Sequence, residues 1–372
     1  MNFDLSQDEE MLKALAERFV NETYDIDRRR AYQREATGFS IDNWRLLGEL
    51  GLIAALFDEA SGGLELDATG IATVFEALGR GLVVEPLIEN GLFAGRLFAD
   101  TAPAALRDAW LPDLITGDRR LAVAHAEAGS RAGRLWVKTR AELSADGAVL
   151  NGAKAYVPAG VDADGYLVSA REGGDPGDPA SVRLFLVPAD APGLAISDWR
   201  MADGGAAVSL RLDGVRVSAD HMVSGGAAAI DKATMLANLA RAAEALGIME
   251  RLFAETKDYL RTREQFGVPL SSFQAIQHRM VAQYAAIEQA RALLNLAMVA
   301  RGDADFVNAV CGVRAFISDV SLTLAHEMVQ FHGGMGVTDE LSIGHGHKRL
   351  LVLSRWPDDP DAALDRFAGI AA

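Results

Sequence analysis

Apolar residues recur at helical spacing in the first and last thirds of the chain. In the first third this period follows Ser6 and returns at 44–52 and 71–82. Ser6 and Glu9 have the spacing of a capping box, which predicts a helix start. In the last third, long amphipathic helices are predicted over roughly 230–262, 274–301 and 304–331, with a shorter one near 345–355.

Between Leu121 and Val223 the pattern changes to short alternating or apolar runs separated by turn residues. The predicted strands are 121–125, 136–143, 148–150, 165–170, 182–188, 208–212 and 215–217. Short strands bracketed by helices predict a compact β-barrel or sandwich. We therefore expect an α+β fold, mostly α, with an N-terminal helical domain (1–120), a middle β domain (121–227) and a C-terminal four-helix bundle (228–372).

A loop containing glycine and proline separates the first two of these long C-terminal helices. Gly267 and Pro269 are predicted to end the first helix. The residues predicted to cap the second are Ser271 or Ser272. Arg263 and Phe266 then lie together at a helix end, where a guanidinium and an aromatic ring could hold a phosphate-bearing ligand.

This loop also resembles a family signature. The sequence Arg263-Glu-Gln-Phe-Gly-Val-Pro-Leu-Ser-Ser-Phe-Gln-Ala-Ile-Gln-His278 is similar to one in acyl-CoA dehydrogenases, flavoenzymes that introduce an α–β double bond into a CoA thioester. A second segment, Gln330-Phe-His-Gly-Gly-Met-Gly336, resembles the family's glycine motif. Seen alone, that segment is typical of a helix cap followed by a turn.

In the family both segments hold the adenosine diphosphate part of an FAD bound in a neighbouring subunit. The resemblance therefore implies FAD as the cofactor. The residues to which it assigns this binding role are Arg263, Gln265, Phe266, Phe273, Gln330, Gly333 and Gly334.

The resemblance is weaker where the family contacts the flavin ring. The family's Thr-Glu-Pro-x-Ala-Gly-Ser is here Ala124-His-Ala-Glu-Ala-Gly-Ser130, and its Asn-Gly-x-Lys-x-Trp-Ile-Thr is Asn151-Gly-Ala-Lys-Ala-Tyr-Val-Pro158. By this resemblance Ser130 is a retained cofactor-binding residue, and Tyr156 is the residue that stacks on the flavin ring. Ala124 has no hydroxyl, however, and Pro158 has neither a hydroxyl nor an N–H.

Removal of the α proton of a thioester requires a base, normally a carboxylate with a raised pKa. Counted without gaps, the two positions where the family carries it fall on Ala237 and Pro357. Glu244, two turns beyond Ala237, and Asp358, next to Pro357, are weak candidates. Such acids are more often solvated or salt-bridged than catalytic.

The residues that would bind an FAD held in a neighbouring subunit thus match the family. Those that would contact a flavin ring in this chain, and the catalytic base, are altered. This pattern, with the ending Gly344-His-x-His-Lys-Arg349, is similar to heteromeric α2β2 members such as pimeloyl-CoA dehydrogenase small subunits. Related pairs act on steroid side-chain CoA esters. The leading hypothesis is the partner subunit of such a heteromer, which lacks its own catalytic glutamate.

Two alternatives stay open. One is a self-sufficient homo-oligomeric acyl-CoA dehydrogenase, a dimer or tetramer, with a displaced base. The other is a non-catalytic scaffold of the same fold. The resemblance implies an acyl-CoA substrate, a homologous subunit as partner and an electron-transfer flavoprotein as acceptor. The acyl chain, and the choice between dehydrogenase and oxidase, are not given by the sequence.

Composition and charge further limit the classes of partner and the compartment that are expected. The 36 Lys and Arg against 52 Asp and Glu give a net charge of −16, which disfavours nucleic acid and anionic membranes. A single cysteine, Cys311, excludes an internal disulfide. An acidic start unlike a signal peptide, and the expectation that no apolar run is long enough to cross a membrane, predict a cytoplasmic protein. His332, His345 and His347 lack a second ligand set of recognised spacing, so no metal site is predicted.

Overall fold

The computed structural model describes residues 5–129, 135–300, 305–357 and 359–369. They form two compact units. The described parts of 1–31, 67–83 and 238–372 make the first, and those of 32–66 and 84–237 make the second. The units follow packing rather than chain order, so the helices before residue 120 are divided between them. The predicted domain boundaries at 120 and 227 stay predictions.

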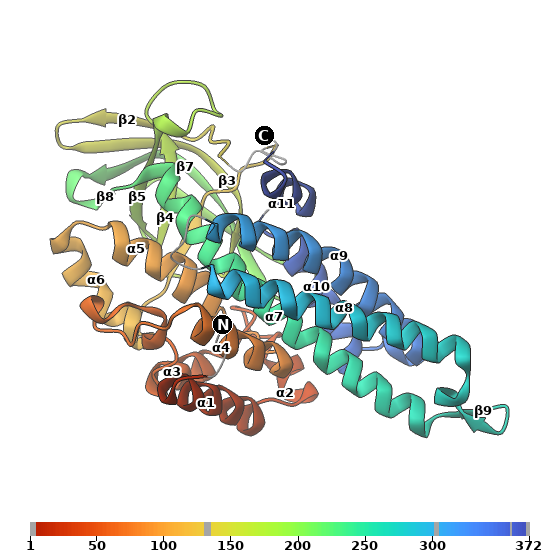
Figure 1. Cartoon of the computed structure of the whole chain (residues 1–372). Coiled ribbons are helices and arrows are strands. Elements are labelled where there is room, and N and C mark those ends of the chain that lie inside the picture. Colours follow the sequence, from red (N-terminus) through yellow and green to blue (C-terminus); the bar gives the residue numbers. More distant parts are fainter. Residues whose placement is uncertain (1–4, 130–134, 301–304, 358, 370–372) are drawn as a thin grey trace. The chain divides into compact units, whose positions relative to one another are not determined.

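The first unit is helical (Figure 1). Its elements are α1 (Gln7–Thr23), α2 (Ile26–Tyr32), α4 (Ala68–Gly81), most of α7 (Gly226–Thr262), α8 (Gln274–Val299), α9 (Phe306–His332), α10 (Ser342–Arg355) and α11 (Pro360–Phe367), with the hairpin strands β9 (Glu264–Gln265) and β10 (Val268–Pro269) and the 3₁₀ turns η6 (Leu270–Ser272) and η7 (Gly333–Val337). The predicted capping box is confirmed, since the Glu9 N–H donates to Ser6 Oγ at 3.3 Å and the Ser6 N–H donates to Glu9 Oε2 at 2.7 Å. The predicted long helices are likewise present, with ends within a few residues of those expected.

Helix α9 corrects one expectation. The segment Phe306–Val337 is long and apolar enough, by those two criteria alone, to cross a membrane. In the structure α9 packs against α8, α10 and α11. Its buried side chains include Val310, Ile317, Leu324 and Met328. The apolar length of α9 therefore supplies the core of the bundle, because neighbouring helices surround a continuous apolar face.

Charged side chains connect three helices of this unit. Glu76 and Arg80 on α4, Glu250 on α7 and Arg291 on α8 form one network, in which Arg80 Nε lies 2.9 Å from Glu250 Oε2 and Arg291 Nη1 lies 3.0 Å from Glu76 Oε2. The helices cross closely here. A Cβ on Gly247 would lie 2.1 Å from the Glu76 carbonyl oxygen, so only glycine permits the contact.

The second unit contains the β-sheet. Its helical elements are α3 (Ile41–Glu49), the 3₁₀ turns η1 (Ala54–Leu56) and η2 (Glu59–Ser61), the π-helix η3 (Leu87–Gly95), α5 (Arg96–Thr101), α6 (Ala104–Thr116), and the 3₁₀ turns η4 (Pro179–Ser181) and η5 (Ala219–His221). Its strands are β1 (Leu121–Ala124), β2 (Arg140–Ser144), β3 (Gly147–Pro158), β4 (Gly165–Arg171), β5 (Val182–Pro188), β6 (Leu194–Arg200), β7 (Ala206–Ser218) and β8 (Met222–Val223). They form one eight-stranded mixed sheet in the order β6-β7-β3-β2-β4-β5-β8, with β1 pairing parallel to β4.

Several strands differ from the prediction. Strand β3 runs over Gly147–Pro158, where only 148–150 was predicted, and the short strand β8 was not predicted. Strand β6 was not predicted, because it lies at the sheet edge with mostly exposed side chains and has no apolar alternation. The runs 208–212 and 215–217 belong to the single strand β7, which passes through Gly214 at a φ of 66°. Glycine had marked a turn in the pattern, and here it allows a left-handed residue within a continuous strand.

A charged pair lies inside this unit. The Lys154 and Glu127 side chains are 0% and 4% exposed, and Lys154 Nζ lies 2.6 Å from Glu127 Oε1. Burial lowers the pKa of Lys154 to about 8, against the attraction of Glu127. Burial by itself would raise the pKa of Glu127, but the Lys154 ammonium and hydrogen bonds from Thr139 leave that pKa lowered.

Glu127→Gln is expected to remove a pH-dependent part of the stability. The lowered folded-state pKa means that the carboxylate stabilises the fold fully above about 4.5, its ordinary value, and loses this effect as the pH falls. Because the substitution leaves Lys154 buried without its counter-charge, we expect a loss of about 3–5 kcal/mol at pH 7. The difference from the wild type should shrink below pH 4.5, as measured by urea unfolding.

Glu17→Gln is the control, since Glu17 forms only an exposed pair with Lys13. Among the described residues, the charged group paired with Glu127 is Lys154, whose pKa of about 8 lies above this pH range. A difference in unfolding free energy that stays constant from pH 7 to pH 4 would contradict the assignment.

Candidate functional site

The segment from Arg263 to Phe273, here called the Arg263 loop, joins the end of α7 to the start of α8 and contains a tight hairpin (Figure 1). Gln265 pairs with Val268, and Phe266 and Gly267 form the turn with φ values of 54° and 79°. Positive φ at both turn residues fits a two-residue hairpin, but it is unfavourable for phenylalanine. The Phe266 side chain is also 94% exposed. A strained, solvated aromatic residue is a feature of ligand and partner sites.

One detail of the predicted loop is corrected. Helix α7 ends at Thr262, where the predicted helix over 230–262 ends, and Gly267 and Pro269 lie in the hairpin that follows. Neither predicted serine caps α8, whose N-cap is Phe273, and Ser272 Oγ instead donates to the Pro269 carbonyl. A 3₁₀ turn occupies the serine positions, and the N-cap of α8 makes no side-chain hydrogen bond.

The Arg263 loop and the glycine segment meet in the structure. Tyr259, whose carbonyl accepts a 2.8 Å hydrogen bond from the Arg263 N–H, stacks on His332 with ring centroids 4.4 Å apart and planes at 21°. His332 ends α9, and Gly333 follows it directly. On α8, the Arg279 guanidinium lies 4.7 Å from the centre of the Phe331 ring. We call this end of the unit, residues 253–284 and 327–337, the arm tip.

The residues predicted to hold the adenosine diphosphate part of FAD all belong to the arm tip. All of them are exposed except Phe273, which is partly buried and lies edge-on to Phe266 at 6.3 Å. A Cβ placed on Gly333 or Gly334 would meet no atom within 4 Å. The open glycine backbone, the arginine and the aromatic rings suit a nucleotide diphosphate. These residues lie together on one exposed surface of the arm tip.

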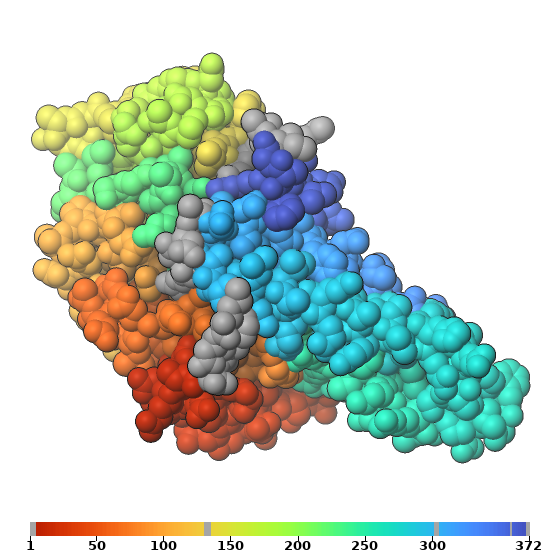
Figure 2. Space-filling view, in the orientation of Figure 1, coloured from red at the N-terminus to blue at the C-terminus, as the bar shows by residue number. Residues whose placement is uncertain are grey.

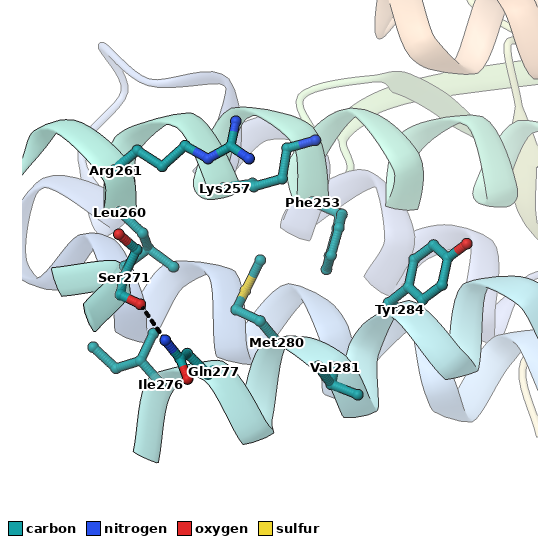
Figure 3. Close-up of a pocket in the computed structure, with 10 residues that line it drawn as sticks. All are labelled: Phe253, Lys257, Leu260, Arg261, Ser271, Ile276, Gln277, Met280, Val281 and Tyr284. Atoms are coloured by element: carbon teal, nitrogen blue, oxygen red, sulfur yellow. Dashed lines mark hydrogen bonds between the residues drawn. The ribbon is translucent and has the colours of Figure 1, made fainter. Parts of the chain in front are cut away.

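An apolar groove lies beside the hairpin, between α7 and α8 (Figure 3). It has a volume of about 300 Å³ and is lined by Phe253, Lys257, Leu260, Arg261, Ser271, Ile276, Gln277, Met280, Val281 and Tyr284. Val281 is 65% exposed and Tyr284 is 52% exposed. Figure 2 shows the surface of this α7–α8 end in teal. The arm tip therefore combines exposed apolar side chains with exposed cations.

The segments that resemble the flavin-ring contacts lie in the second unit. Tyr156 is half-buried, with its ring 5.1 Å from that of Trp199 and its hydroxyl 2.9 Å from Met201 Sδ. Ala124 is fully buried, and Pro158 is buried within the β3–β7 ladder. Neither supplies the hydroxyl that the family uses. Ser130 lies outside the described residues.

Of the two candidate bases, Glu244 is among the described residues and Asp358 is not. Glu244 is buried, and both its oxygens accept from Arg349, at 2.6 Å from Nε and 2.9 Å from Nη2. A bidentate arrangement of this kind commits the carboxylate to the guanidinium. It favours a structural role for Glu244. Asp358 lies outside the described residues, and Ala237 is fully buried.

Several contributing residues were not identified from the sequence. Tyr259 lies one helical turn before Arg263 but carries no motif, and His332 had been weighed only as a metal ligand. Trp199 lies on the unpredicted strand β6, and Met201 directly follows that strand. The spacing between Tyr259 and Arg263 could have indicated a shared helix face, but no pattern indicates which distant ring stacks on it.

Known proteins resemble the chain along nearly its whole length. Three domain models of one family match it: the acyl-CoA dehydrogenase N-terminal domain over residues 6–118, the middle domain over 121–215 and the C-terminal domain over 224–356. The acyl-CoA dehydrogenase FadE27 of Mycobacterium tuberculosis is 29% identical over 347 residues, which cover 91% of this chain and 90% of that one.

Two solved structures share both the fold and part of the sequence. A variant of the Tcur3481-Tcur3483 steroid ACAD has a TM-score of 0.88 and 30% identity, covering 98% of this chain and 97% of that one. The ChsE4-ChsE5 complex from Mycobacterium tuberculosis has a TM-score of 0.90 and 26% identity, covering 99% and 98%. These findings confirm the resemblance and the expected fold class. The chain belongs to the acyl-CoA dehydrogenase family of FAD-dependent oxidoreductases, which act on acyl-CoA thioesters.

Proposed function

We propose that this chain is the partner subunit of a heteromeric acyl-CoA dehydrogenase, and that a homologous subunit supplies the catalytic base. The observation that carries the proposal is a contrast within the chain. Its nucleotide-type residues lie on the exposed arm tip, whereas Glu244 is held in a bidentate ion pair with Arg349. Residues presented to solvent in this way suit a cofactor held against another subunit.

The chain's own residues have defined tasks in this proposal. The Arg263 guanidinium binds the pyrophosphate, and Phe266 and Phe273 pack against the adenosine. Gly333 and Gly334 let the main chain approach the ligand closely. FAD, when bound, accepts the hydride that leaves the β carbon of the acyl-CoA. The α proton passes to a carboxylate of the other subunit.

The apolar groove supports the same arrangement. Exposed Val281 and Tyr284 flank the nucleotide-type residues, and a second subunit covering the arm tip would remove this apolar surface from water. Two of the similar structures are named as pairs, Tcur3481-Tcur3483 and ChsE4-ChsE5. An electron-transfer flavoprotein is the proposed acceptor, and a steroid-type CoA ester is a substrate candidate by its similarity to the first pair.

Co-expression tests the proposal. The chain is purified alone and with an acyl-CoA dehydrogenase homologue encoded beside it, and FAD per chain and acyl-CoA-dependent dye reduction are measured. The substrate panel holds short-chain, dicarboxylic and steroid side-chain CoA esters. We expect activity only from the pair. Full activity from the chain alone would overturn the proposal, and absence of FAD from every assembly would favour the scaffold.

Arg263→Ala should weaken FAD binding by the assembled pair about 10- to 100-fold, because charge-assisted hydrogen bonds contribute about 1.5–3 kcal/mol. The stability of the isolated chain should change by less than about 0.5 kcal/mol, since the side chain is exposed. Arg211→Ala removes the same charge from an exposed position on β7, outside the arm tip, and serves as the control. Equal losses in the two variants would indicate a general electrostatic effect and contradict specific binding. FAD affinity is measured by fluorescence titration.

Glu244→Gln separates the partner-subunit proposal from the self-sufficient enzyme. Because the change leaves Arg349 without its carboxylate, it should cost about 1–3 kcal/mol of unfolding free energy. In the active pair it should leave the rate of flavin reduction nearly unchanged. A catalytic base contributes about 100- to 10,000-fold to a rate. A loss of that size in a folded, FAD-loaded variant, followed by stopped-flow absorbance, would identify Glu244 as the base.

A further inference from the structure

Strand β3 contains a bulge at the residue that resembles the flavin-stacking position. Its pairing with β7 shifts between Lys154 and Val157, so Ala155 and Tyr156 leave the regular ladder. The Ala155 N–H donates instead to the Ala126 carbonyl at 2.9 Å, and Ala126 forms an isolated bridge with Tyr156. A bulge changes the direction of a side chain. This bulge therefore sets where the Tyr156 ring points.

Lys154 lies directly before the bulge and is fully buried. Its ammonium donates to three acceptors: the His125 carbonyl at 3.2 Å, Glu127 Oε1 at 2.6 Å and Ser169 Oγ at 3.0 Å. All three N–H groups of the ammonium thus have partners on other segments. The ammonium connects β3 both to β4, through Ser169, and to the 125–127 segment that pairs with the bulge.

Glu127 extends this network to a third segment. It accepts from the Lys138 N–H at 2.7 Å and from the N–H and hydroxyl of Thr139 at 3.0 and 2.7 Å. Buried charges are costly unless they are paired and hydrogen-bonded in good geometry. Each displacement of the 125–127 segment would break several of these bonds at once, so the segment has one favoured position.

The residue types in this network also occur in nucleophilic sites, since His125 Nδ1 lies 2.8 Å from Ser169 Oγ, which also accepts from Lys154. Burial argues against that role, because Ser169 and the Lys154 side chain are both 0% exposed. A substrate cannot reach a hydroxyl in that position. The network acts on the structure around it.

The outer side of the bulge is also held. Ser209 Oγ donates to the Ala155 carbonyl at 2.9 Å, and the Trp199 indole N–H donates to Ser209 Oγ at 3.2 Å. The Trp199 ring and the Met201 sulfur contact Tyr156 itself. Tyr156 is thus fixed from the interior by an ion pair and from the surface by aromatic and sulfur contacts.

We infer that Lys154 is a positioning residue for Tyr156, acting through its ion pair with Glu127 and the pairing of the 125–127 segment with the β3 bulge. The contacts that define the bulge are all made within the chain. The inference rests on the proposed function only in naming a flavin as the group that Tyr156 faces. The chain has Ala124 and Pro158 where the family carries hydroxyls, and Tyr156 is the residue to which the resemblance assigns ring stacking.

Hydrogen–deuterium exchange of the cofactor-free chain tests the inference. Lys154→Met should raise exchange about tenfold in peptides covering 125–127, 138–139 and 155–156, while peptides of β5 (Val182–Pro188) stay protected. The control is Lys232→Met, because the Lys232 side chain is 80% exposed. The near-ultraviolet circular dichroism of the Tyr156–Trp199 pair, identified by its loss in Trp199→Phe, should change in Lys154→Met and persist in the control.

The double variant Glu127→Gln/Lys154→Met separates positioning from general stability. It leaves no unpaired buried charge, so local protection should return to within about threefold of the wild type. Unchanged exchange in Lys154→Met, a uniform rise over the whole chain, or no recovery in the double variant would each overturn the inference. The FAD content of the co-expressed pair is measured in a separate experiment. Absence of FAD would overturn the proposed function, and the exchange data would still decide the role of Lys154.

Discussion

The stacked rings of Tyr259 and His332 are the contact on which the candidate site depends. They join the end of α7 to the end of α9, two segments more than sixty residues apart in the chain. Tyr259 lies one turn before Arg263, and His332 directly precedes Gly333. The Arg279 guanidinium over the Phe331 ring joins the same two segments from α8. Together these contacts hold the arginine hairpin and the glycine segment side by side in the arm tip.

The arm tip is unusual for a surface of a highly acidic protein. Arg261, Arg263 and Lys257 are concentrated there beside exposed aromatic and aliphatic side chains. A solvated Phe266 at positive φ is unfavourable both in backbone conformation and in hydration. Contact with a nucleotide and a second subunit would offset the cost in hydration. The Lys154 network, by contrast, is made of buried contacts within the second unit.

Much of the fold could be predicted from the sequence, because helical periodicity in α7, α8 and α9 and the two long motifs are strong local signals. Some local predictions failed for identifiable reasons. Strand β6 was not predicted because it is an exposed edge strand without apolar alternation. The serines after Pro269 lie in a 3₁₀ turn instead of capping α8. No apolar run was expected to be long enough to cross a membrane, whereas Phe306–Val337 meets that length and hydropathy.

The site could be predicted only in part. The motifs identify Arg263 and Gly333 because family signatures record residues in fixed order along the chain. They cannot record that Glu244 has Arg349 as its partner, since that contact joins α7 to α10 across about a hundred residues. The same holds for the Tyr259–His332 stack and for the three acceptors of Lys154. These contacts depend on tertiary packing, which a single sequence does not display.

The most direct test of the partner-subunit account is a cryo-electron microscopy structure of the assembled pair with FAD bound. The account predicts that the Arg263 guanidinium of this chain contacts the pyrophosphate of an FAD whose ring lies in the homologous subunit. It also predicts that the carboxylate nearest the substrate α carbon comes from that subunit. An FAD enclosed only by copies of this chain, or an arm tip left in solvent, would contradict it.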